Sequence, residues 1–101
     1  MEKFTLKKEM IQSYEVVGSD CMELIISGST KIVLSEIHIT GSGNNPYIRC
    51  DMNLCIYDEL LDTKIDFTQE VGIYIDELIM ESSLDVWIKY EETKFEKWRC
   101  I

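Results

Sequence analysis

The sequence predicts a mainly β protein: a single antiparallel β-sandwich or half-barrel domain with one helix, an α+β fold being the alternative. Apolar and polar residues alternate along several segments, as they do in strands with one solvated face. Short turn signals separate these segments, which favours antiparallel neighbours. One longer segment, at about 68–81, repeats its apolar residues at helical spacing. A chain of 101 residues, 46% of them hydrophobic, suits one domain over 1–101.

Three strands are expected in the first forty residues, at 10–17, 21–26 and 31–40. Gly18-Ser19-Asp20 separates the first two, and Gly28-Ser29-Thr30 separates the second from the third. Turns this short join strands that lie side by side and run in opposite directions. The segment therefore predicts an antiparallel meander.

The clearest alternation in the chain runs over residues 47–57. One parity is wholly apolar and comprises Ile48, Cys50, Met52, Leu54 and Ile56. The other parity carries Asp51, Cys55 and Tyr57, so this strand is expected to be buried on one face only. Two further strands, at 84–90 and 95–101, are expected to form a hairpin.

Residues 68–81 are ambiguous between helix and strand. The helical stripe consists of Val71, Tyr74, Ile75, Leu78 and Ile79, and Thr68 is a suitable N-cap. Alternating β-branched residues and Gly72 weaken a helix. The length of the segment favours the helix, which would place Asp76 and Glu77 on its outer side.

Negative charge is concentrated in one part of the chain. Residues 51–85 contain ten carboxylates and one lysine, so this stretch carries the whole net charge of −9. A one-signed surface of this kind predicts a basic protein partner, the alternative being a surface that only keeps the protein soluble. Direct binding to nucleic acid or to an anionic membrane is not expected, because lysine and arginine are scattered.

The sequence predicts no catalytic group, metal site or cofactor, and hence no enzyme. His38 is the only histidine, and its strand position between two isoleucines is not that of an activated base. The four cysteines lack the Cys-x-x-Cys spacing of zinc or redox sites. A cytoplasmic location is expected, because the chain starts without the apolar region of a signal peptide.

Aromatic residues are interleaved with the acids. Strand parity places Tyr57 on the polar face of its strand and Trp87 on the face of Asp85, a mixture that suits capture of lysine and arginine. The alternative is that these rings pack a core. The candidate partner-binding residues are Asp51, Tyr57, Asp58, Glu59, Asp62, Asp66, Asp76, Glu77, Asp85 and Trp87.

The small size and acidity of the chain resemble those of bacterial toxin-immunity proteins. Asp51-Met52-Asn53-Leu54-Cys55 is similar to the Asp-x-Asn-Trp-Leu strand of the WapA-type immunity proteins, with Leu54 in place of Trp and Cys55 in place of Leu. The resemblance implies a non-enzymatic inhibitor that covers an essential surface of a cognate toxin, often a basic nuclease.

Two other functions remain open from the sequence. A phage anti-defence protein or nucleic-acid mimic shares the same size and charge. A small β-barrel could instead bind an apolar ligand in an interior lined by Ile48, Met52, Leu54 and Ile56.

Overall fold

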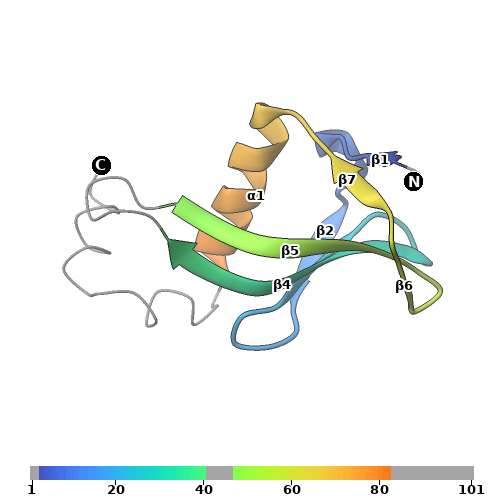
Figure 1. Cartoon of the computed structure of the whole chain (residues 1–101), viewed down its shortest axis with the longest axis horizontal. Coiled ribbons are helices and arrows are strands. Elements are labelled where there is room, and N and C mark those ends of the chain that lie inside the picture. Colours follow the sequence, from blue (N-terminus) through green and yellow to red (C-terminus); the bar gives the residue numbers. More distant parts are fainter. Residues whose placement is uncertain (1–2, 41–46, 83–101) are drawn as a thin grey trace.

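The computed structural model describes residues 3–40 and 47–82, which form two sheets and one long helix (Figure 1). The larger sheet is antiparallel, with the spatial order β2 (Ser13–Val16), β3 (Met22–Ile25), β4 (Thr30–Thr40), β5 (Tyr47–Ile56) and β6 (Glu59–Leu61). The smaller sheet pairs β1 (Lys3–Thr5) in parallel with β7 (Lys64–Asp66). A 3-10 turn, η1 (Lys8–Met10), and the helix α1 (Gln69–Glu81) complete the described elements. The prediction of a mainly β, antiparallel domain with one helix is confirmed, and the layer facing the large sheet is the helix, in the α+β manner.

The predicted N-terminal meander is confirmed as β2, β3 and β4, which pair as consecutive antiparallel neighbours. The sequence did not predict β1, because three residues are too few to show an alternation. β1 is held by pairing with β7, and the amide of Leu6 extends this pairing by donating to the carbonyl oxygen of Asp66 at 2.8 Å. The predicted C-terminal hairpin, 84–90 with 95–101, lies outside the described residues.

One face of the large sheet forms the core. Cross-strand pairing sets Leu24 beside Ile32 and Ile32 beside Leu54, while Leu34 lies opposite Met52 on the next row. The apolar parity predicted for β5 is thus confirmed as the core-facing one. Helix α1 covers this face (Figure 1) and contributes Val71, Ile75, Leu78 and Ile79 to the same buried cluster.

Cys55 departs from the predicted parity, since it belongs to the expected solvated face but is buried. The register places Lys31 of β4 on one side of it and Leu60 of β6 on the other. A small thiol between two larger neighbours is shielded from solvent even on an outer face. The pattern within one strand carries no information about that shielding.

The predicted helix is confirmed, including its cap. The hydroxyl of Thr68 accepts a hydrogen bond from the amide of Val71 at 3.4 Å. Gly72, which favoured a strand in the sequence, has a packing role: a Cβ atom there would lie 3.3 Å from the ring of Phe67. Among the described residues, no helix is long and apolar enough to cross a membrane.

Candidate functional site

The predicted partner-binding residues do not share one surface. Tyr57, Asp58 and Glu59 lie at the turn between β5 and β6. Asp62 lies in the short connection between β6 and β7. Asp51 lies six residues before Tyr57 on the same extended segment, which corresponds to about 20 Å. The other predicted residues are Asp66 at the end of β7, Asp76 and Glu77 on α1, and Asp85 and Trp87, which lie outside the described residues.

The β5–β6 turn has an unfavourable backbone conformation for its residues. Ile56 pairs with Glu59, which leaves Tyr57 and Asp58 as a two-residue hairpin loop. Both have positive φ angles, 52° and 64°, as a type I′ turn requires. Gly and Asn adopt this conformation readily, whereas a tyrosine there costs about 1 kcal/mol. The turn is anchored because the amide of Tyr57 donates to the carbonyl oxygen of Ser29 at 2.9 Å.

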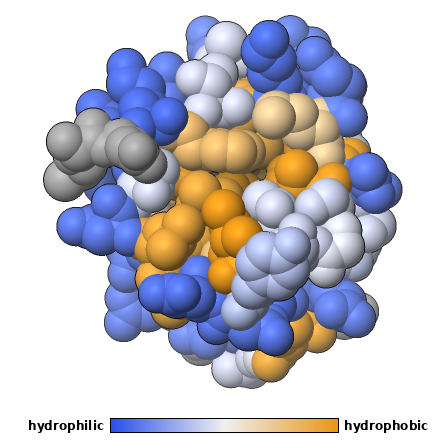
Figure 2. Space-filling model, turned by 90° about the vertical axis from the view of Figure 1, so that its right-hand side faces the viewer, coloured by the Kyte–Doolittle hydropathy of each residue, from blue (hydrophilic) through white to orange (hydrophobic). Residues whose placement is uncertain are grey.

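This turn presents large side chains to solvent. Tyr57 is 82% exposed and Leu60, in β6, is 60% exposed. Figure 2 shows the end of the molecule that carries β1, β6 and β7: apolar residues gather in the middle of this face, and hydrophilic residues surround them. We call the group Tyr57, Asp58, Glu59, Leu60 and Asp62 the β6 end.

A groove of about 320 Å³ adjoins the β6 end. Its lining includes Tyr57 and Asp58 together with Glu15 and Glu23, which are paired across β2 and β3. Lys31 lies among these acids, with its Nζ 3.1 Å from Glu23 and 3.8 Å from Asp58. The hydrogen bond to Glu23 raises the pKa of Lys31. Three carboxylates around one ammonium leave the groove negative.

The sequence interpretation missed Glu15 and Glu23, which precede the acidic stretch. Glu15 pairs with Glu23 across β2 and β3, and Glu23 lies opposite Val33 of β4, so the sheet register brings both acids to the groove. No local pattern in the first forty residues signals it. The acidic surface is therefore drawn from both halves of the chain.

Asp51 belongs to a different acidic cluster, at an irregularity in β4. The β4–β5 register shifts between Ser35 and His38, and Glu36 there has a positive φ of 52°. A hydrogen bond to Asp51 raises the pKa of Glu36, and the negative charges of Asp51 and Asp20 raise it further. No group of three or more His, Cys, Asp or Glu in the described part of the chain is arranged to hold a metal ion.

His38 lies at the same irregularity and is exposed. Its Nδ1 donates to the carbonyl oxygen of Glu36 at 2.7 Å. This contact gives the imidazole a local structural role.

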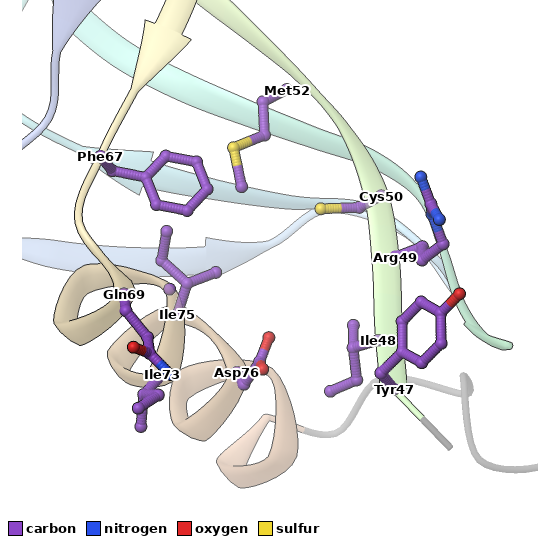
Figure 3. A pocket seen from close by; sticks show the side chains of 11 residues that line it. Tyr47, Ile48, Arg49, Cys50, Met52, Phe67, Gln69, Ile73, Ile75 and Asp76 are labelled. Atoms are coloured by element: carbon purple, nitrogen blue, oxygen red, sulfur yellow. The ribbon is translucent and has the colours of Figure 1, made fainter. Parts of the chain in front are cut away.

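A second cleft lies between α1 and β5, with a volume of about 510 Å³ (Figure 3). Asp76 lines it and is half-buried, so the expectation that this residue lies on the outer side of the helix was wrong. Asp76 follows the buried Ile75 in sequence, and the packing of α1 against the sheet turns it towards β5 (Figure 3). Glu77, the next residue, is exposed as expected. The other lining residues are Tyr47, Ile48, Arg49, Cys50, Met52, Phe67, Gln69, Gly72, Ile73 and Ile75.

Burial shifts two ionisable groups in this cleft. It raises the pKa of Asp76 to about 6, because the carboxylate has lost part of its hydration. It also raises the pKa of Cys50 to about 11, with a smaller contribution from the charge of Asp76. Cys50 is therefore a neutral thiol near pH 7 and a poor nucleophile.

Asp76→Asn should make the domain more stable near pH 7 and flatten its pH dependence. The folded pKa lies above the ordinary value of 3.8, so the folded protein binds more protons than the unfolded chain between pH 4 and 6. The free energy of unfolding should consequently fall as pH rises through this range. Because the carboxyl is only half-buried, solvent screening reduces the gain to about 1 kcal/mol.

Urea unfolding at pH 4.5 and pH 7.5 measures this effect. Glu36 also has a raised pKa and contributes in the same direction, so the informative quantity is the difference between wild type and Asp76→Asn. Equal pH dependence in the two proteins would contradict the assignment to Asp76.

Comparison of the chain with protein-family models, with curated proteins and with solved structures finds no match. The described structure offers two candidate sites, the β6 end with its groove and the cleft between α1 and β5.

Proposed function

We propose that this protein is a non-enzymatic inhibitor that binds a basic protein partner through the β6 end. In its most specific form the proposal is an immunity protein that neutralises a cognate bacterial toxin such as a nuclease. The observation that carries the proposal is the display of Tyr57, a large ring held in a turn whose backbone conformation disfavours it.

The turn favours this proposal because residues other than tyrosine would make it more stable. Positive φ angles at both loop positions suit Asn-Gly or Asp-Gly. Tyr57 instead bears a conformational cost and exposes 82% of its surface. Residues held in unfavourable backbone conformations cluster at functional sites, and tyrosine is enriched among the residues that dominate binding energy.

The surroundings of Tyr57 fit a basic partner. Leu60 supplies an exposed apolar contact, while Asp58, Glu59 and Asp62 supply charge around it. Interfaces commonly combine an apolar centre with a polar rim. The net charge of −9 would attract a basic protein over distance and orient the encounter.

The double reversal Asp58→Lys and Asp62→Lys should slow association with the partner several-fold at low salt. Exposed rim charges act mainly on the association rate, and the effect should shrink as salt shortens the screening length to about 8 Å near 0.15 M. Stopped-flow or surface plasmon resonance measurements over a salt series give the rate.

A matched control is Glu9→Lys with Glu70→Lys, which changes the net charge equally at two exposed acids near the start of α1. This control should slow association much less. If neither pair changes the rate at any salt concentration, the acidic surface serves solubility only and the proposal fails.

The partner itself can be identified through the genome and by capture. The immunity form predicts that the adjacent gene encodes a toxin, and that co-expression of this chain restores growth of cells producing it. A purified toxin that neither binds this chain nor is inhibited by it would contradict the immunity form. Capture of a phage-defence protein would indicate the anti-defence alternative.

A second candidate function is the binding of a small apolar ligand. The cleft between α1 and β5, of about 510 Å³, lies within the usual range for small-molecule sites and is lined by Ile48 and Met52. The charged group in this cleft favours a different occupant.

A further inference from the structure

We propose that the cleft between α1 and β5 receives an arginine side chain of the protein partner, with Asp76 as its counter-ion. This inference rests on the proposed function, because it names a second contact made with the same basic protein. It would make the binding surface two-sited, with the β6 end supplying one contact and the cleft another.

Within 3–40 and 47–82, the carboxylate of Asp76 has no compensating group. Among the described residues, no hydrogen bond or ion pair to its carboxylate is found. A half-buried carboxylate in an apolar cleft loses part of its hydration, and here no hydrogen bond or ion pair among the described residues replaces it. The raised pKa of about 6 reflects that loss. A cation entering the cleft would remove this penalty.

Of the described residues, one cation lines the cleft, and it contacts a ring rather than Asp76. Arg49 lines the cleft, but its guanidinium lies over the ring of Tyr47, 5.8 Å from the ring centroid. Figure 3 shows Arg49 beside Tyr47 on β5, while Asp76 projects from α1 across the cleft. Cys50, the other ionisable group nearby on β5, is neutral at physiological pH. Arg49 keeps its positive charge at the Tyr47 end of the cleft, and Asp76 is the negatively charged residue of the lining.

The shape and lining fit an arginine side chain. Phe67, 38% exposed, offers an aromatic face, and Ile48 and Ile73 offer aliphatic surface. Guanidinium groups stack on aromatic rings and bind carboxylates through two parallel hydrogen bonds. The aliphatic stem of arginine would pack against the isoleucines. A purely apolar ligand would leave the carboxylate buried and uncompensated.

The experiment uses two small probes on the full chain: n-butylguanidinium, which reproduces the end of an arginine side chain, and n-butylurea, its neutral counterpart. Titration at pH 7.5 is followed by NMR shifts of the Ile48 and Ile73 methyl groups and of the Asp76 carboxyl. Wild type should bind the guanidinium at least five-fold more tightly than the urea. A pH titration of the Asp76 carboxyl resonance with the guanidinium present should also show its pKa lowered towards the ordinary value of 3.8.

Two variants complete the design. Asp76→Asn, which should remain folded, should bind the two probes equally. Glu77→Gln removes the same charge from the adjacent exposed position and should behave as wild type. Equal binding of both probes by wild type, tighter binding of the urea, or an equal loss in Glu77→Gln would each overturn the inference.

These outcomes are separable from the fate of the proposed function. The probe titration needs no protein partner, whereas the reversals at Asp58 and Asp62 measure association with one. If the cleft does not bind the guanidinium, the further inference fails, but the proposal that the β6 end binds a basic partner is unaffected. If the reversals at Asp58 and Asp62 do not change the association rate, the proposed function fails, but the affinity of the cleft for the guanidinium probe is unaffected.

Discussion

Tyr57→Asn is expected to raise the Kd of the complex with the basic partner about 30-fold or more, which corresponds to roughly 2 kcal/mol. The substitution removes the ring and keeps a side chain that tolerates positive φ. Relief of backbone strain should leave the folded domain as stable as wild type or about 0.5–1 kcal/mol more stable. The loss should appear mainly as a faster off-rate that persists at high salt.

Two further variants make this result specific to the tyrosine ring. Tyr57→Phe keeps the ring in place and should retain most of the affinity. Val17→Ala truncates an exposed apolar residue beside the β2–β3 turn, 49% exposed, and should change neither binding nor stability appreciably. Wild-type affinity in Tyr57→Asn would remove the β6 end as the binding surface, with thermal melting showing that the variant is folded.

Ile79→Ala should lower the free energy of unfolding by about 2–5 kcal/mol. Ile79 is 0% exposed and lies in the cluster that joins α1 to the large sheet, so truncation leaves a cavity between the two layers. Equilibrium unfolding in urea measures the change. A loss of this size could leave few folded molecules, in which case the more conservative Ile79→Val should still cost about 1 kcal/mol.

Met80→Ala is the matched control, because Met80 is the next residue on the helix and is 40% exposed. Its effect should be within about 0.5 kcal/mol. Comparable losses in the two variants would mean that α1 does not face the sheet as described.

Local periodicity carried most of the fold prediction. The helical stripe ending at Ile79 and the alternation from Ile48 to Ile56 are properties of contiguous segments, and tertiary packing agrees with both. The features that the sequence did not predict depend on contacts with residues distant in the chain. Cys55 is buried between residues of two other strands, and β1 exists through its pairing with β7.

The candidate site shows the same division. Composition identified the acidic stretch, and strand parity placed Tyr57 on the outside, where the structure has it. The residues of the stretch are nevertheless distributed over separate surfaces, and Glu23 joins the groove from outside it. The position of Asp76 depends on how α1 is rotated against β5, which the packing of both elements determines.

The parallel pairing of β1 with β7 has a consequence for the order of assembly during synthesis. β2, β3, β4 and β5 are joined to their sheet neighbours by nearby residues and can pair as each emerges from the ribosome. Lys3 pairs with Lys64, so closing this contact spans about 60 residues and costs more chain entropy than any hairpin in the sheet. Among the described strands, we expect β1 to be the last to dock. Until β1 docks, the backbone of β7, which leads into α1, lacks this partner, so β1 secures the start of the helix only after the large sheet has formed.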